Sequence, residues 1–212
     1  MSKDFDAASH QWDAIADQWD ENRTAPSATL ALFRPFAHGT VLDVGCGNGR
    51  NSKELAKTSK RVIALDASAA MLEKAEKNLH GLNNVQTLHA GMQAIPLPDR
   101  FVDAVFCLAA LHHLKPSEQS QALAEFFRVL KTGGTLCLTV WNRQQARFKH
   151  KPKEQDVPWH GKSRYYYFFD EDELHALLKA AGFAVEKTVY EKSGDPVAAS
   201  DAQNLCMVAK KP

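Results

Sequence analysis

Residues 40–50 read TVLDVGCGNGR, an apolar run followed by glycines at alternate positions, Gly45, Gly47 and Gly49. The pattern predicts a buried parallel strand that leads into a helix, with glycines where a ligand approaches the backbone. A Walker-type phosphate loop would need Lys and then Ser or Thr after the last glycine, but Arg50-Asn51 stands there. The dinucleotide pattern Gly-x-Gly-x-x-Gly would need glycine at position 50. The stretch therefore excludes the first kind of loop and disfavours the second.

The spacing Asp43-x-Gly45-x-Gly47-x-Gly49 resembles motif I of the class I methyltransferases, which bind S-adenosylmethionine (SAM). An acidic residue should then end the next strand and hold the ribose hydroxyls, and RVIALDAS places Asp66 there, 21 residues after Gly45. An ordinary tight turn explains the glycines alone but not this second signal. The resemblance implies SAM as the cofactor, bound by Asp43, Gly45, Cys46, Gly47, Asn48, Gly49, Asp66, Ala67, Met71, Gly91, Met92 and Leu108.

The composition is that of a soluble globular protein. The chain has 212 residues, of which 44% are hydrophobic and 24% charged, so we expect a single domain, residues 1–212. No apolar run approaches the roughly 20 residues of a membrane span, and the polar N-terminus lacks the apolar core of a signal peptide. We expect a cytoplasmic protein that does not enter the membrane. Four scattered cysteines predict reduced thiols, with neither a zinc site nor disulfides.

Positive charge is concentrated in one segment. The net charge is +1, which argues against a generally basic nucleic-acid binder. Between residues 142 and 164, however, seven Lys or Arg face two acidic residues, which leaves 19 basic and 23 acidic residues elsewhere. We call residues 142–169 the basic insert and expect it to contact the substrate.

The pattern of elements predicts a doubly wound α/β fold with a seven-stranded, mostly parallel, Rossmann-like sheet and an antiparallel last strand. Helices are expected over residues 5–21, 27–36, 50–58, 68–79 and 117–131, and from a capping box at Asp170-x-x-Glu173 to Gly182. Strands are expected to begin at residue 40 and to cover 61–65, 85–89, 101–108, the end of RVLKTGGTLCLTVW, 184–191 and 204–210. Residues 1–36 form a helical cap in this interpretation, with the first helix over the cofactor cleft.

The fourth predicted strand runs into the pair His112-His113, at the edge of the sheet where open α/β folds bind ligands. Neighbouring histidines do not converge easily on one metal ion, and no carboxylate or cysteine stands at ligand spacing, so no metal site is predicted. The resemblance assigns the pair to motif IV, in which one histidine lies beside the transferred methyl group; a loop histidine without a role is the alternative. Gly91 departs from the family, which has Asp there for the adenine amino group, so adenine would rely on the Met92 backbone or on Gln93.

The segments outside the core resemble the tRNA methyltransferases that esterify the carboxymethyl group of a wobble uridine. The similar residues are Trp12-Asp13-x-Ile15-Ala16, Arg23, His112-His113, Trp141, Asp156-Val157-Pro158-Trp159, the run RYYYFF from Arg164, Glu173-Leu174, Tyr190-Glu191-Lys192 and the run NLCMV from Asn204. Two features differ from that family: Gly91, and extra residues from Ser193 to Gln203 in the last hairpin. The resemblance implies the tRNA anticodon loop as substrate and a small zinc-binding activator protein as partner.

A carboxylate acceptor is ionised at neutral pH, so it needs a cation and hydrogen-bond donors rather than a general base. Arg23 and Arg164 are the candidate cations. The basic insert would meet anticodon phosphates, and Tyr165, Tyr166, Trp141 or Trp159 could stack on bases, although at least half of the rings from Tyr165 to Phe169 are expected in the core and the insert could be a solvated loop. The predicted catalytic set is Arg23, His112, His113, Trp141, Arg164 and Tyr165.

Two alternatives remain open at the level of sequence. A small-molecule methyltransferase of the ubiquinone and menaquinone type has similar His-His-Leu and Gly-Gly motifs, but should carry an apolar lid where this chain is rich in Lys and Arg. A noncatalytic subunit with the same fold is disfavoured by the intact glycines and Asp66.

Overall fold

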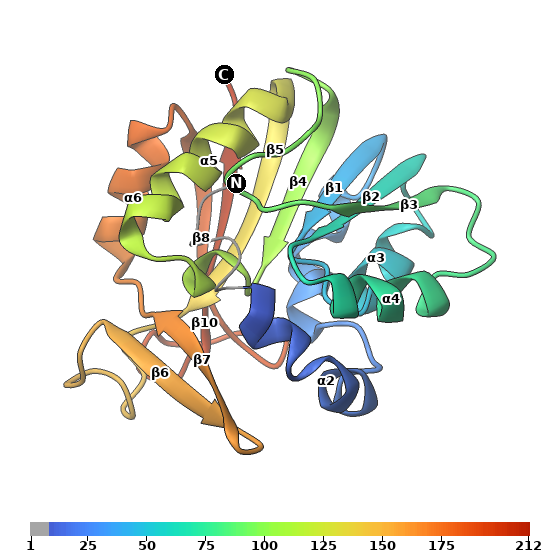
Figure 1. Ribbon diagram of the computed structural model, residues 1–212. Helices are drawn as coiled ribbons and strands as arrows, with labels where there is room; N and C mark the ends of the chain where they lie inside the picture. The colour runs from blue at the N-terminus through green and yellow to red at the C-terminus, as the bar shows by residue number, and fades with distance from the viewer. Residues whose placement is uncertain (1–8) are drawn as a thin grey trace.

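The fold is built on one large sheet. In the computed structural model, which describes residues 9–212, eight strands follow the order β3-β2-β1-β4-β5-β10-β8-β9 (Figure 1). The strands are β1 (Thr40–Val44), β2 (Arg61–Asp66), β3 (Val85–His89), β4 (Val102–Leu108), β5 (Leu130–Trp141), β8 (Ala184–Lys192), β9 (Asp195–Pro196) and β10 (Asn204–Lys210). Strand β10 is antiparallel to both β5 and β8. The predicted α/β fold with an antiparallel last strand is confirmed, and the two-residue β9 adds an eighth strand.

The strand order reverses between β1 and β4, because β2 and β3 lie on one side of β1 while β4 and β5 continue on the other. These five strands run parallel, and Val41, Leu42 and Val44 of β1 are fully buried. In open parallel sheets a ligand binds at the carboxyl ends of the strands where the order reverses. The loops after β1 and β4 are therefore the place to look for a site.

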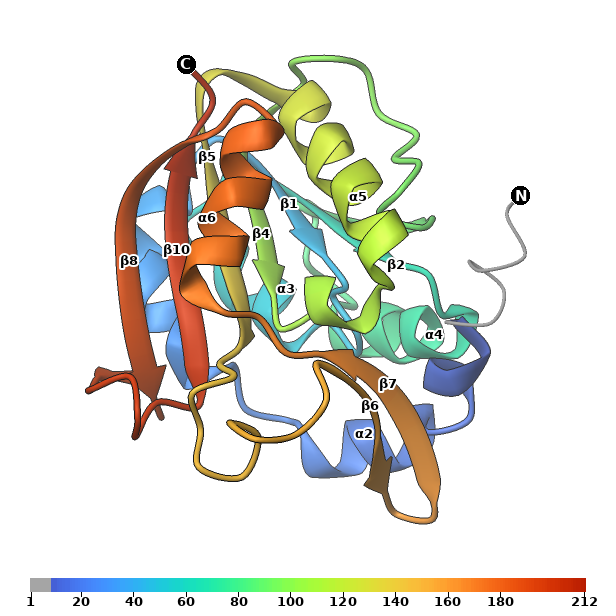
Figure 2. The same ribbon diagram turned by 90° about the vertical axis from the view of Figure 1, so that its left-hand side faces the viewer.

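Helices cover both faces of the sheet. Helices α5 (Pro116–Val129) and α6 (Glu171–Ala180) lie over one face, as Figure 2 shows, and bury residues such as Phe126 and Leu174. The other face is covered by the 3-10 helix η1 (Ala28–Phe36), by α3 (Arg50–Leu55) and by α4 (Ala69–Asn78). Full burial of one such Leu or Phe side chain contributes about 1.5 to 3 kcal/mol. The two apolar layers hold the sheet rigid beneath its loops.

The N-terminal cap differs from the single helix expected over residues 5–21, of which 5–8 lie outside the described part. Residues 9–13 are helical, a turn follows at Ala14-Ile15, and α2 spans Ala16–Asn22. Asp13 explains the break, since its carboxylate accepts hydrogen bonds from the Ser68 hydroxyl (2.6 Å) and the Ala70 amide (3.1 Å) at the start of α4. The first turn is thus fixed to the fold, and the chain bends after it.

Two other helix predictions are corrected at their ends, and one helix is of a different type. The second segment is a 3-10 helix rather than an α-helix and contains Pro35, which has no amide hydrogen to donate. Helix α3 ends at Leu55 rather than at residue 58. Helix α5 ends at Val129, and the next residue already belongs to β5. Local periodicity located these helices but did not predict the residues at which they end.

The basic insert contains a hairpin that the sequence analysis missed. Strands β6 (Glu154–Trp159) and β7 (Lys162–Tyr167) pair antiparallel around a two-residue turn, His160-Gly161, in which both φ angles are positive (47° and 78°). Such turns match the twist of a two-stranded ribbon. The hairpin lies beside α2 beyond the carboxyl ends of the central strands (Figures 1 and 2). The cap and the basic insert therefore meet over the predicted ligand edge.

The capping box predicted at Asp170 does not form, although α6 begins where it was expected. The Asp170 side chain makes no capping bond. Its carboxylate instead accepts from Arg143 (3.1 Å) and lies 3.2 Å from the Lys153 ammonium. Two basic residues of the insert thus compete successfully for the group that would have capped the helix.

Candidate active site

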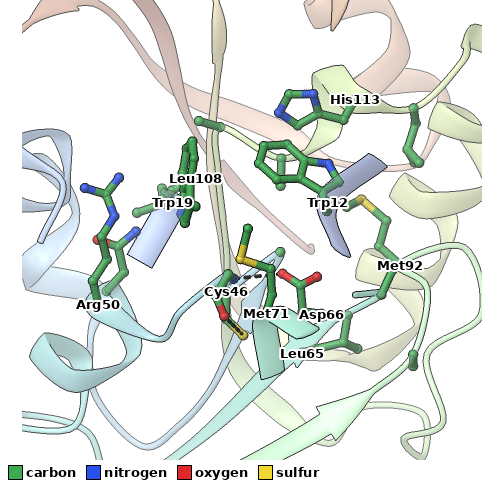
Figure 3. Close-up of a pocket in the computed structure, with 18 of the residues that line it drawn as sticks. Trp12, Trp19, Cys46, Arg50, Leu65, Asp66, Met71, Met92, Leu108 and His113 are labelled. Carbon is green, nitrogen blue, oxygen red and sulfur yellow. Dashed lines mark hydrogen bonds between the residues drawn. The ribbon is translucent and has the colours of Figure 1, made fainter. Parts of the chain in front are cut away.

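A pocket lies at the carboxyl ends of the central strands (Figure 3). Its floor comes from the loops that follow β1, β2, β3 and β4, and Trp12 and Trp19 of the cap cover it. Figure 3 shows Asp66 and Met71 on one side and Trp12 with His113 on the other. The lining includes Gly45, Cys46, Gly47, Arg50, Leu65, Asp66, Ala67, Met71, Ala90, Met92, Gln93, Leu108, Ala109, Ala110, His113 and Leu114. We call this the first pocket.

Glycine is required in the loop after β1 because this loop lies very close to the loop after β4. Gly45 has φ +67°, and a Cβ there would fall 2.4 Å from the Cβ of Ala110 in the loop after β4. Gly47 also has a positive φ (+55°), and its amide donates to the Asp66 carboxylate at 2.7 Å. Side chains at these positions would separate the two loops and close the floor of the pocket.

Asp66 is the fixed acceptor of the first pocket. It is 8% exposed, and its carboxylate accepts from the Gly47 amide (2.7 Å) and the Ser68 amide (2.9 Å). Burial raises the pKa of Asp66 above its ordinary value, while these bonds favour the ionised form. A carboxylate held in this way, beside glycines that leave backbone accessible, fits the ribose hydroxyls of an adenosine-containing ligand.

Four residues predicted to bind SAM do not line the first pocket: Asp43, Asn48, Gly49 and Gly91. Burial raises the pKa of Asp43 to about 6, and its carboxylate accepts from the Ser52 hydroxyl at 2.5 Å. The Asn48 amide donates to the Asp20 carboxylate (2.8 Å) and the Arg23 carbonyl (3.0 Å). Asp43 thus supports the glycine loop from behind, and Asn48 ties it to the cap.

A second pocket adjoins the first and shares Trp19, Arg50, Ala109 and His113 with it. Ala109 lies at the junction with φ +58°, which is uncommon for a residue other than glycine. The remaining lining comes from residues 22–29 of the cap, from the basic insert and from the end of the chain; it includes Arg23, His112, Trp141, Arg147, Trp159, Arg164, Tyr166, Glu191 and Asn204. Four arginines thus face one carboxylate, and we call this the arginine pocket.

Arg164 is a buried cation in an aromatic box. It is 5% exposed, and its guanidinium carbon lies 5.2 to 5.7 Å from the ring centroids of Trp12, Trp19, Trp159 and Tyr166. Burial and the nearby Arg23 lower its pKa. Its Nε has no hydrogen-bond partner, and within residues 9–212 no carboxylate pairs with it. Because a buried unpaired charge is costly, such a group indicates a site for an anion.

The one carboxylate of the arginine pocket, Glu191, already accepts hydrogen bonds from neighbouring residues. Glu191 is fully buried and accepts from the Thr29 hydroxyl (2.9 Å), the Asn204 amide (2.8 Å) and the Gly194 amide. It joins η1 to the last strands and does not reach Arg164. The arginine pocket therefore presents positive charge to a ligand.

Both histidines of the predicted set line the arginine pocket, and only His113 also lines the first. Burial lowers the pKa of His112 well below its usual value and that of His113 to about 3. Both rings are neutral at physiological pH. They can donate or accept hydrogen bonds, but they supply no positive charge.

The other predicted catalytic residues lie as follows. Trp141 lines the arginine pocket and stacks on Tyr166 at 4.4 Å. Arg23 lies over the Trp19 ring at 5.5 Å. Tyr165 lines neither pocket, since its hydroxyl donates to Glu154 at 2.8 Å and β7 turns it away, whereas Tyr166 faces inward. The predicted set omitted Arg50, Arg147, Trp159 and Tyr166 of the arginine pocket, and the alternation of β7 was the signal for Tyr166.

Only some of the positively charged side chains of the basic insert are exposed and outside ion pairs. Arg143 pairs with Asp170, which precedes α6, Lys153 pairs with Asp170 and with Glu173 of α6, and Arg164 is buried. Four cations stay exposed: Arg147, Lys149, Lys151 and Lys162. Tyr166 to Phe169 are buried, so the expectation that at least half of the rings pack in the core is confirmed.

Comparison with known proteins agrees with the geometry of the first pocket. Residues 41–134 match the model of a methyltransferase domain family. Residues 41–134 form a class I SAM-dependent methyltransferase domain. A probable SAM-dependent methyltransferase of Mycolicibacterium smegmatis is 32% identical over 164 residues, which cover 77% of this chain and 59% of that protein. The demethylmenaquinone methyltransferase of Clavibacter sepedonicus is 27% identical over 210 residues, 87% of this chain and 85% of that protein.

Solved structures share the fold. The complex of the Haloferax volcanii Trm112 methyltransferase activator with a methyltransferase matches with a TM-score of 0.76 and 22% identity, over 97% of each chain. The complex of DhpI with S-adenosylhomocysteine (SAH) matches with a TM-score of 0.74 and 22% identity, over 100% of this chain and 98% of that one.

The cofactor of this methyltransferase is SAM, and the first pocket fits it. Asp66 would hold the ribose, and Gly45 and Gly47 would let the ligand reach the backbone. Gln93 lines the same pocket and donates an amide hydrogen to Glu118 (2.8 Å). Its oxygen would be the acceptor for the adenine amino group, in place of the Asp that is absent at position 91. Within residues 9–212 no cluster of His, Cys, Asp or Glu could hold a metal ion, and none of the helices there has the length and apolarity that crossing a membrane requires.

Proposed function

We propose that this methyltransferase transfers the methyl group of SAM to a carboxylate oxygen, and that this carboxylate is the carboxymethyl group of a modified wobble uridine in tRNA. The observation that carries the proposal is the buried Arg164, whose Nε has no hydrogen-bond partner and whose charge meets no carboxylate within residues 9–212, in a cavity with three more arginines beside the first pocket. An anionic acceptor would supply the negative charge that no described residue brings to Arg164.

The roles of the residues follow from the chemistry. SAM, when bound, supplies an electrophilic methyl group on a sulfonium that is attacked in line. Arg164 and Arg23 would bind and orient the acceptor carboxylate, and Trp12 and Trp19 would exclude water from the junction of the pockets. A carboxylate carries no proton at neutral pH, so no residue has to remove one. The low pKa values of His112 and His113 agree with this, because neither ring is tuned to act as a base near pH 7.

Exposed groups around the arginine pocket support an RNA acceptor. Lys149, Lys151 and Lys162 lie on the surface of the basic insert, where they can contact phosphates. Arg147 lies over the Trp141 ring at 5.1 Å, and Trp159 is partly exposed on β6. Aromatic and guanidinium planes next to a cationic surface are the usual means of binding splayed bases. A cytoplasmic enzyme of tRNA modification fits these features.

The second candidate is a small-molecule methyltransferase of the quinone type, which the similarity to the Clavibacter protein favours. An apolar quinone precursor brings no negative charge to Arg164, and four arginines line the pocket that would have to hold it. A noncatalytic role is disfavoured because the first pocket, with its intact glycine loop and Asp66, adjoins the arginine pocket.

A small zinc-binding activator protein is proposed as partner, as the structural neighbour that forms a complex with Trm112 suggests. Production with and without a Trm112-type protein tests this proposal. We expect low soluble yield and weak turnover of the isolated chain and a gain of both in the pair. Full solubility and full turnover of the chain alone would contradict it.

The test of the acceptor is incubation with isotope-labelled SAM and bulk tRNA, with and without the activator, followed by nucleoside mass spectrometry. We expect label in a methyl-ester uridine. Label absent from RNA while SAM still binds would refute the tRNA acceptor and move the search to small carboxylates and quinone precursors. Heat-denatured protein serves as the control for nonenzymatic methylation.

A further inference from the structure

Two adjacent histidine rings face the arginine pocket in contact with each other. The ring centroids of His112 and His113 are 4.4 Å apart, with planes inclined at 69°. Tyr166 packs against both, at 5.1 Å and 4.4 Å, and Trp12 packs against His113 at 4.7 Å. The two rings are therefore held in fixed positions rather than free to flip into solvent.

The backbone fixes the tautomer of His112. Its Nδ1 lies 3.1 Å from the amide nitrogen of Trp141, and an amide N–H can only donate, so Nδ1 is the acceptor. The single proton of the neutral ring must then be on Nε2. This Nε2–H has no partner within residues 9–212 and belongs to a ring that lines the arginine pocket. His112 thus offers the pocket a hydrogen-bond donor.

The backbone fixes His113 in the opposite tautomer. Its Nδ1 lies 2.9 Å from the carbonyl oxygen of Tyr165, which can only accept, so Nδ1 carries the proton. Nε2 of His113 is then a bare lone pair at the junction of the two pockets, and no group in the described part of the chain donates to it. His113 thus offers an acceptor.

We propose that His112 and His113 form a donor–acceptor pair that recognises an amide or imide edge of the acceptor molecule, a carbonyl oxygen beside an N–H. The inference rests on the proposed function and deepens it, because uracil presents this edge next to the ring position that bears the carboxymethyl group. His112 donates to the carbonyl and His113 accepts from the N–H.

The pair distinguishes this substrate class from a plain carboxylate. A carboxylate only accepts hydrogen bonds, so it matches Arg164 and the donor of His112 but is repelled by the lone pair of His113. A substrate with a carboxylate and an amide or imide edge satisfies all three groups. A ligand without the N–H leaves the His113 lone pair buried and unmatched, which weakens binding.

The tautomers can be tested without any substrate. Two-bond nitrogen–proton correlation spectra of protein labelled with 15N-histidine should show His112 protonated at Nε2 and His113 at Nδ1, both unchanged between pH 5.5 and 8.5. Loss of one signal set in His112→Asn and of the other in His113→Asn assigns them. The same tautomer at both positions would overturn the proposal.

Recognition of the imide edge by the two histidines is tested with two anticodon stem–loop RNAs that carry 5-carboxymethyluridine, one of them also methylated at N3. With SAH bound, we expect the wild-type protein to bind the first RNA about tenfold more tightly than the second. The His113→Asn variant keeps an amide donor for the Tyr165 carbonyl but loses Nε2, so the ratio should fall to about one. His112→Asn keeps an acceptor for the Trp141 amide and loses the outer donor, so both RNAs should bind more weakly with the ratio retained. His38→Asn, on the exposed surface, is the matched control.

The outcomes separate this inference from the proposed function. Equal binding of both RNAs by the wild-type protein would overturn the donor–acceptor pair even if the carboxymethyl group is methylated. Discrimination at N3 without methyl transfer to either RNA would support the pair and refute the proposed reaction. An unchanged ratio in His113→Asn would show that the discrimination arises elsewhere and would overturn the assignment.

Discussion

The first pocket and the arginine pocket touch at four residues but are built in different ways. The first is made chiefly of backbone and small side chains from the loops after β1, β2, β3 and β4, within residues 45–114, with two cap tryptophans above. The arginine pocket is made of long side chains from the cap, the basic insert and the last strands. Cofactor binding thus depends on local backbone geometry, whereas acceptor binding depends on residues that only the tertiary structure brings together.

The comparison predicts opposite sensitivities. Adding atoms to the floor of the first pocket should weaken cofactor binding strongly. Removing a charge from the arginine pocket should leave cofactor binding unchanged and weaken recognition of the acceptor.

The largest effect is expected for Gly45→Ala. Its new Cβ would lie 2.4 Å from Ala110 Cβ at a φ of +67°, so the loops after β1 and β4 cannot keep their spacing. We expect SAM affinity to fall at least about 100-fold, measured by calorimetry. Gly81→Ala is the matched control, because its φ is +84° but nothing lies within 4 Å of the added Cβ. Wild-type affinity in Gly45→Ala would contradict the backbone account of this pocket.

The substitution Arg164→Met tests the prediction for the arginine pocket. We expect kcat/KM for the acceptor to fall about 10- to 150-fold, because a charge-assisted contact of about 1.5 to 3 kcal/mol is lost, with the Kd of SAM unchanged. The free energy of unfolding should stay the same or rise, since a buried charge without a carboxylate partner is replaced by an apolar side chain. Lys179→Met, which replaces an exposed cation of α6 that lines neither pocket, is the control. A parallel loss of SAM affinity would show that the two pockets are not separable.

Asp66→Ala removes the fixed acceptor of the first pocket. We expect SAM binding to weaken by about 1.5 to 3 kcal/mol, from the lost hydrogen bonds to a charged group and from release of the Gly47 amide. Asp66→Asn, which keeps an acceptor but no charge, should lose less. A dissociation constant unchanged in both variants would remove Asp66 from the cofactor site.

A smaller effect concerns Asp43, which supports the glycine loop. Burial raises its pKa from 3.8 to about 6 in the folded protein, so the folded state binds a proton that the unfolded state releases between these values. The stability that this proton contributes is complete below pH about 4 and is lost as the pH rises through 6, a change of about 2 to 3 kcal/mol. The difference in unfolding free energy between wild-type protein and Asp43→Asn should follow this course in denaturant titrations. A difference that does not vary with pH would contradict it.

The first pocket could be predicted from the sequence because the motifs that form it are local. The glycine spacing and Asp66 belong to consecutive strand–loop units, and the order of the strands fixes where their ends meet. Periodicity also located the helices, although α5 ended early because Leu130 enters the sheet. The cap broke at Ala14-Ile15 because Asp13 bonds to α4, a contact with residues more than 50 positions away.

The arginine pocket could be predicted from the sequence only in part. Arg164 and Arg23 could be chosen for their charge, but the box of four rings around Arg164 joins two cap tryptophans to a hairpin that the sequence analysis did not predict. Tyr165 was chosen where Tyr166 faces the pocket, since the hairpin register decides which of two neighbouring rings points inward. The opposite tautomers of His112 and His113 depend on backbone groups of Trp141 and Tyr165, which no local pattern shows.

The most direct test of the central claim compares two stem–loop RNAs that differ only in the charge of the acceptor group, 5-carboxymethyluridine and its neutral carbamoylmethyl analogue. Their affinities for the protein with SAH bound are measured for the wild type and for Arg164→Met. We predict that the wild type prefers the carboxylate about tenfold or more and that the preference disappears in Arg164→Met. Equal affinities in the wild-type protein would contradict the claim that the arginine pocket holds an anionic acceptor.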